Sequence, residues 1–281
     1  MIRMPAVAGA FYPSQPEALK RLIVQCFQHR LGPGVVPELH RPPEGKLLGL
    51  IVPHAGYIYS GPIAAHSYSS LAQNGFRWAL LLGPNHTGMG EEEFAIMSQG
   101  FWRTPLGDMK IESEKAAILK SIPSVKEDPT AHLGEHSLEV QLPFLQFLSP
   151  EAQFVPICIS SMDLQEIKEV GGKVGELLKG DREAVIIAST DLSHYHSHST
   201  ASKLDNLAIE AIAQLDSDLL WERVHSIPIT MCGYAPVIVL LEACKALGVR
   251  EGRLLKYATS GETGGDFSQV VGYCAMAFFK S

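Results

Sequence analysis

The chain has 281 residues, of which 46% are hydrophobic and 19% charged, and this balance favours a large folded core over disorder. Its net charge is −7 and its Lys and Arg residues form no basic stripe, so we expect neither a nucleic-acid partner nor a membrane partner. The chain shows no apolar run of transmembrane length, no signal-peptide pattern and no CxxC pair among its five cysteines, so we expect a cytoplasmic protein.

The first predicted elements are a helix and a loop. Residues 16–29 predict the helix, and residues 32–45 are rich in proline and glycine. Too little chain precedes this second segment to form a core of its own. We therefore interpret it as a loop within the same domain and not as an interdomain linker.

Apolar runs without polar alternation predict strands that are buried on both faces, as in a largely parallel sheet. The segments that carry them are 47–61, 78–88, 153–160 and 184–195. Helices are predicted at 61–73, 113–120, 135–148, 163–179, 200–214, 216–225 and 233–247. Because proline lacks an amide donor, Pro143 predicts a kink or a break just before it.

The last segment, residues 254–279, predicts two strands joined by a Gly-rich loop and added antiparallel to the sheet. No break in composition divides the chain. We therefore predict an α/β fold in a single domain over residues 1–281, with a central mixed, largely parallel sheet flanked by helices.

Polar residues follow three of the predicted strands. They are His54, His86, and the pair Asp191 and His194. In open parallel sheets, ligands bind outside the carboxyl ends of the strands. One histidine at a strand end is more often a hydrogen-bonded structural residue than a ligand. Three such strand ends on one side of a sheet favour a functional site.

Six separated motifs appear in the order of a known family. They are PAVAG with FYP at 5–13, PHAGY at 53–57, GPNH at 83–86, EHS with Glu139 and QLPF at 135–144, STDLSHY at 189–195, and Cys232-Gly233. Together they resemble the Memo family, of the AmmeMemoRadiSam system protein B type, from about residue 3 to about residue 278.

This resemblance implies an architecture like that of the class III extradiol dioxygenases, which use non-haem iron. It implies a site on His54, His86 and Cys232, with Asp191 and His194 in the same cleft. The wider fold has a glutamate where this family has the cysteine, which argues against ordinary ring-cleaving dioxygenase activity. Family members are linked to copper- or iron-dependent redox chemistry and, in animals, to phosphotyrosine-containing peptides.

Two imidazoles and one thiolate suit iron(II), copper or zinc better than magnesium or calcium. We predict iron(II) or copper as the cofactor, with His54, His86 and Cys232 as its ligands. Each has an alternative interpretation: the histidines as caps of their strands, and Cys232 as the start of a helix, where its pKa would be lowered.

Asp191 and His194 are the predicted catalytic residues. Asp191 either accepts the second N–H of a ligand histidine or caps a turn. His194 is a candidate general base, and its neighbours His196 and His198 are interpreted as part of a solvated turn. Glu135 and His136 are expected at a helix start, and they are candidates for lining the cleft.

Three functions fit these residues. The first is a metal-dependent redox enzyme that acts on a small or peptide-borne substrate. The second is a non-catalytic module that binds a peptide or phosphopeptide in the same cleft. The third is a zinc-dependent hydrolase in which Asp191 and His194 activate water, although the sequence has no HExxH motif.

Overall fold

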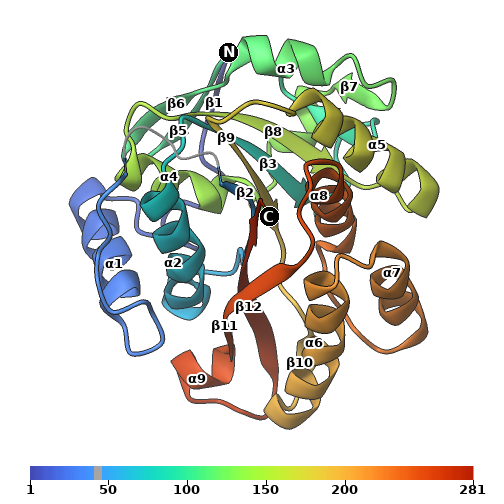
Figure 1. Ribbon diagram of the computed structural model, residues 1–281. Coiled ribbons are helices and arrows are strands. Elements are labelled where there is room, and N and C mark those ends of the chain that lie inside the picture. Colours follow the sequence, from blue (N-terminus) through green and yellow to red (C-terminus); the bar gives the residue numbers. More distant parts are fainter. Residues whose placement is uncertain (41–45, 281) are drawn as a thin grey trace.

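The centre of the fold is a set of four parallel strands, seen in the computed structural model of Figure 1, which describes residues 1–40 and 46–280. In spatial order they are β2 (Leu47–Val52), β9 (Ala184–Ser189), β3 (Trp78–Pro84) and β8 (Gln153–Ile159). Every residue of β2, β9 and β3 is buried. These are the strands that the apolar runs predicted, and helices cover both of their faces.

Shorter and antiparallel strands extend this sheet on both sides. On the β2 side lies antiparallel β12 (Val270–Phe279), which also pairs with β11 (Gly252–Thr259) and β10 (His194–His196). On the β8 side lie β4 (Phe94–Ile96) and β7 (Val125–Glu127). A separate small sheet contains β1 (Ile2–Arg3), β5 (Phe101–Thr104) and β6 (Gly107–Lys110). The prediction of a mixed, largely parallel sheet flanked by helices is confirmed.

The helices form two layers. Helices α1 (Pro16–Gln28), α2 (Tyr57–Asn74) and α4 (Leu142–Leu148) lie on one side of the sheet in Figure 1, and α5 (Leu164–Leu177) and α8 (Tyr234–Ala246) lie on the other. The remaining helices are α3 (Ser113–Leu119), α6 (His198–Ala213), α7 (Ser217–Ser226), α9 (Ser260–Gly264) and the 3₁₀ turns η1 (Pro129–His132) and η2 (Glu139–Gln141). Within the described residues, no helix is both long and apolar enough to cross a membrane.

Two predicted helices differ from the observed ones. The helix predicted at 61–73 begins earlier, at Tyr57. The helix predicted at 135–148 is α-helical only from Leu142, one residue before Pro143, and a 3₁₀ turn precedes it. Glu135 therefore does not lie at a helix start. Of the predicted loop at 32–45, residues 41–45 lie outside the described residues, as does Ser281 of the predicted domain; one domain over 1–281 stays a prediction.

Helices α5 and α8 pack closely because two glycines of α5 face α8. A Cβ atom at Gly171 would lie 2.7 Å from the Val239 carbonyl oxygen, and one at Gly175 would lie 2.6 Å from the Ala243 carbonyl oxygen. Such distances are too short for any side chain, so this contact requires glycine at both positions. The same contact fixes α8, whose first turn follows Cys232.

A buried ion pair between Arg3 and Glu139 ties the N-terminal segment to the 3₁₀ turn η2. Arg3 Nη1 lies 2.5 Å from Glu139 Oε2, and both side chains are buried. Arg3 also donates to the carbonyl oxygens of His132 at 2.8 Å and Glu135 at 2.6 Å. Glu139 in turn accepts from the Tyr12 hydroxyl at 2.6 Å. This network fixes the backbone on either side of His136.

Removing one partner of this pair would leave the other charge buried and uncompensated. We therefore expect Glu139→Ala to lower the free energy of unfolding by about 3–5 kcal/mol, measured by urea denaturation. The exposed pair Glu17–Lys20 provides the control, because Glu17→Ala should cost less than about 1 kcal/mol. Equal effects of the two substitutions would contradict the importance of burial.

Candidate metal centre

Three strands deliver their site residues in the same way. His54 follows the end of β2 by two residues, His86 follows β3 by two, and Asp191 follows β9 by two. Because these strands are parallel neighbours, their carboxyl ends meet at one edge of the sheet. Two further residues come from loops: His136 just before η2, and Cys232 just before α8.

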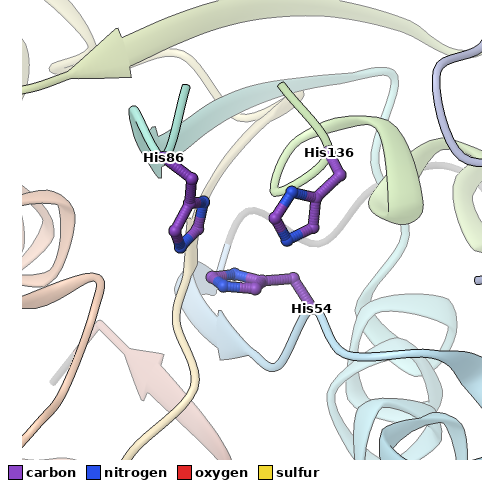
Figure 2. A group of neighbouring side chains, drawn as sticks. All are labelled: His54, His86 and His136. Atoms are coloured by element: carbon purple, nitrogen blue, oxygen red, sulfur yellow. The ribbon is translucent and has the colours of Figure 1, made fainter. Parts of the chain in front are cut away.

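Three imidazoles form the core of the site. One ring nitrogen from each of His54, His86 and His136 lies within 4.8 Å of the others. The ring centroid of His54 is 5.1 Å from that of His86 and 5.5 Å from that of His136. The rings of His86 and His136 stack with their centroids 4.7 Å apart. Figure 2 shows the three rings converging from different segments of the chain. His54 is buried, whereas the side chains of His86 and His136 are 32% and 22% exposed.

The tautomer of His54 follows from its hydrogen bonds. Its Nδ1 lies 2.8 Å from Ser189 Oγ. The Ser189 hydroxyl donates its proton to the Ser137 carbonyl at 2.7 Å and accepts from Gln141 Nε2 at 2.9 Å. A hydroxyl has only one proton to donate, so Ser189 must accept from His54 and Nδ1 must carry the hydrogen. The lone pair of His54 therefore lies on Nε2, at the Cys232 side of the ring.

Glu135 orients His86 in the same manner. Its buried carboxylate accepts from His86 Nδ1 at 3.0 Å and from the backbone N–H groups of His86 at 2.5 Å and Ser137 at 2.8 Å. Burial alone would raise the pKa of Glu135, but these hydrogen bonds outweigh it and lower the pKa to about 2. An ionised carboxylate can only accept, so Nδ1 of His86 carries a hydrogen, and in the neutral imidazole the lone pair is therefore on Nε2.

Burial favours the neutral form of the His54 and His136 imidazoles. It is the main cause that lowers the pKa of His54 well below its ordinary value, and the nearby His136 and His86 lower it further. Burial likewise lowers the pKa of His136, opposed by the Glu135 carboxylate. Neutral imidazoles offer a lone pair, which is the form that binds metal ions.

The Cys232 thiol lies against this group. Its Sγ is 3.2 Å from His54 Nε2 and accepts from the Asp191 N–H at 3.3 Å. Since Nε2 of His54 has the lone pair, the thiol is the donor of the hydrogen bond to it. Burial, and then the Asp191 carboxylate, raise the pKa of Cys232 to about 12. The prediction that a position at a helix start would lower the pKa of Cys232 is therefore wrong. Formation of the thiolate here needs a positive charge nearby.

Asp191 and His194 lie beside the imidazoles. Asp191 Oδ1 accepts the backbone N–H of His54 at 2.9 Å, and Oδ2 is 4.0 Å from His54 Nε2. Burial raises the pKa of Asp191 to about 7. His194 Nδ1 donates to the Thr230 carbonyl at 3.1 Å, which leaves the lone pair on its Nε2. Burial also lowers the pKa of His194, so its ring is neutral at neutral pH.

The donor set fits a transition-metal ion. Imidazole nitrogen and thiol sulfur suit iron(II), copper or zinc. Bonds of about 2.0–2.3 Å place two ligands of one ion roughly 3–4 Å apart. The Cys232–His54 pair, at 3.2 Å, is already at this spacing. The limit of 4.8 Å for the three imidazole nitrogens is slightly wider.

Comparison with known proteins identifies the family. The family described as Memo-like protein matches residues 3–277. The chain belongs to the Memo-like family. It is 49% identical to a MEMO1 family protein of Methanopyrus kandleri, covering 99% of both chains, and 46% identical to one of Methanocaldococcus jannaschii, covering 98% of both.

A solved structure shares the fold of this Memo-like protein. The crystal structure of an uncharacterized protein from Escherichia coli K12 superimposes with a TM-score of 0.53 and 13% sequence identity, covering 83% of this chain and 99% of that one. At this identity the likeness concerns the fold alone. It agrees with the mixed α/β architecture, while the family membership confirms the resemblance found in the motifs.

The structure brings the predicted site residues of the Memo-like chain together. His54 and Cys232 are in contact, and His86 shares the imidazole group. Asp191 lies beside His54, and His194 is near enough to lower the pKa of His54. Their roles as ligands and catalytic groups stay predictions. The side chain of His54 is oriented by the hydrogen bond that it donates to Ser189, whereas Asp191 accepts from the backbone N–H of His54. Ser189 and Gln141 belong to the family motifs, but the sequence assigned them no role, and it gave His136 only as a candidate for lining the cleft.

The raised pKa of Cys232 predicts slow alkylation in the chelator-treated protein. Because iodoacetamide reacts with thiolate, labelling of Cys232 should stay slow at pH 8 and rise only towards pH values of about 11–12. Peptide mass spectrometry follows the site, and Cys232→Ser defines the background from the four buried cysteines. Half-maximal labelling at or below about pH 9, the ordinary range for a thiol, would contradict this environment.

Proposed function

We propose that this Memo-like protein is a metal-dependent redox enzyme that acts on a small or peptide-borne substrate, with iron(II) or copper held by His54, His86 and Cys232. The observation that carries the proposal is the direction of the lone pairs. Ser189 and Glu135 fix the Nδ1 hydrogens of His54 and His86, so both Nε2 atoms are left to bind an ion. His136 supplies a further nitrogen in the same group.

The metal would supply electron transfer and open positions for oxygen or substrate. The chain's own residues handle protons. Cys232 would hold the cation as a thiolate and release its Sγ proton to solvent, because its pKa is too high for ionisation without a cation. His194 offers a neutral Nε2 as a base, and Asp191, with its pKa near neutrality, can take up or release a proton at Oδ2.

The sulfur ligand separates this proposal from a zinc hydrolase. Thiolate is softer than the carboxylate of the usual iron oxygenase site, so it favours copper(I) more strongly. Zinc binds the same donors but carries out no redox chemistry. The five free cysteines also support the predicted cytoplasmic location, where thiols remain reduced.

Metal binding tests the proposed ligands. Titration of chelator-treated protein with iron(II) and with copper(I), each under anaerobic conditions, should show one site per chain. The double variant His54→Ala/Cys232→Ser should weaken binding by about a hundredfold or more, since it removes two ligands. His225→Ala, outside this imidazole group, should bind like the wild type and serves as the control.

Two outcomes would overturn the proposal. One is an unaltered chain with no affinity for either ion. The other is stoichiometric zinc together with esterase or amidase turnover that chelation abolishes, which would favour the hydrolase. Oxygen consumption with ascorbate as the reductant, present in the loaded wild type and lost in the double variant, supports redox chemistry.

The residues that accept the Nδ1 hydrogens of His54 and His86 should also affect the affinity for the metal ion. We expect Ser189→Ala and Glu135→Gln each to weaken metal binding by about 10–100-fold, because each frees one ring to rotate or change tautomer. Ser67→Ala is the matched control, since Ser67 is also a buried serine that donates to a backbone carbonyl, that of Ile51, at 2.7 Å. Loss of affinity in Ser67→Ala equal to that in Ser189→Ala would point to general destabilisation instead.

A further inference from the structure

A cavity of about 410 Å³ opens beside the candidate metal centre. Its walls come from the start of α2, from α9, and from the beginning of β12, with Tyr59, Ser260 and Tyr273 among the lining residues. Helix α9 packs against α2, near its lower end in Figure 1. A volume of this size accommodates a small organic molecule.

Three neighbours connect the cavity to the centre. Ala55, which lines it, directly follows His54 in the chain. Val271, also in the lining, is the register partner of His194 in the β10–β12 pair. The next residue of β12, Gly272, exchanges backbone hydrogen bonds with the segment between Asp191 and His194, at 2.8 and 2.9 Å. The lining thus includes the chain neighbour of His54 and the register partner of His194.

The walls favour an aromatic body. Tyr59 is 43% exposed, and a Cβ atom at Gly264 would lie 3.2 Å from its ring. This glycine leaves room for the ring to lie along one wall. Tyr273 is buried and also lines the cavity, and Ala55 and Val271 add apolar surface. Flat apolar molecules stack well on such rings.

The polar lining favours a cation. Asp266 belongs to the lining, and hydrogen bonds from the Ser268 side chain and backbone to its Oδ1, at 2.6 and 2.9 Å, hold its carboxylate in place. Neither Lys nor Arg is among the described residues that line the cavity. An anionic group such as a phosphate would find no partner here, whereas an ammonium group can bind the carboxylate and the face of Tyr59.

We propose that this cavity is a binding site for small aromatic amines and serves as the substrate pocket of the metal centre. The second part rests on the proposed redox function, while the first part depends on the cavity alone. The amine would lie between Asp266 and Tyr59, with the ring directed towards Tyr273 and Ala55. This chemistry disfavours phosphotyrosine as an occupant.

Amide NMR titration of chelator-treated protein with phenethylamine tests the site without any metal. Shifts should concentrate at Ala55, Ser260 and Gly264. Phenylacetate, which has the same ring with a negative charge, and phenyl phosphate should bind at least tenfold more weakly. Equal or tighter binding of either anion, or shifts located elsewhere in the chain, would overturn the proposal.

Two variants separate the ring from the charge. Tyr59→Leu should weaken phenethylamine binding by about tenfold, and Asp266→Asn by about threefold, as expected for an exposed ion pair. Phe101→Leu and Glu176→Gln, an exposed aromatic residue and an exposed acid outside the lining, are the matched controls and should bind like the wild type. Unchanged binding in both Tyr59→Leu and Asp266→Asn would place the amine elsewhere.

The two proposals can fail independently. Phenethylamine binding in a chain that binds neither iron(II) nor copper(I) would keep the amine site and remove its link to redox chemistry. Metal binding without phenethylamine binding would overturn the amine site and leave the metal centre intact.

Discussion

The buried carboxylate of Glu135 is the interaction on which the rest of the site depends. It is completely enclosed, yet its pKa is about 2, because three hydrogen bonds from His86 and Ser137 stabilise the charged form. A buried charge of this kind is costly unless its partners are in place. It therefore fixes the end of β3 against the segment before η2, and with it the relative positions of His86 and His136.

The imidazoles of His54 and His86 are oriented by different hydrogen-bond acceptors. His86 is oriented by a charge, and His54 by a neutral chain of hydrogen bonds through Ser189 to Gln141 and the Ser137 carbonyl. Both chains meet at the segment 135–141, which Arg3 fastens to the N-terminal strand. The site is thus built from the sheet edge and one loop together, and neither alone would define it.

The four central strands could be predicted because each is an unbroken apolar run, and most helices because their apolar residues repeat with the helical period. β2, β3, β8 and β9 appear as uninterrupted apolar runs, and Pro143 marks the point where α4 begins. Strands such as β1 and β4, with two and three residues, are too short to show any period. Their existence depends on pairing with distant segments.

Only the site residues that directly follow a predicted strand could be predicted from the sequence pattern. His54, His86 and Asp191 follow apolar runs, so their proximity follows from the topology of a parallel sheet. Cys232 was connected to them by the family resemblance and not by any local pattern. His136 has a local sequence typical of a helix start, and its true position depends on Arg3 and Glu135 in three dimensions. Ser189 and Gln141 lie in the family motifs, but their hydrogen bonds depend on contacts between distant segments and could not be predicted from the sequence.

The contact between α5 and α8 has an effect far from where it occurs. Cys232 sits directly before the first turn of α8, while Gly171 and Gly175 set how near that helix comes to α5. A methyl group added at either glycine would push α8 away from α5. The Cys232 sulfur, which lies just before the first residue of α8, would move with the helix. A substitution in the α5–α8 contact would thus displace the Cys232 thiol before it unfolds the protein.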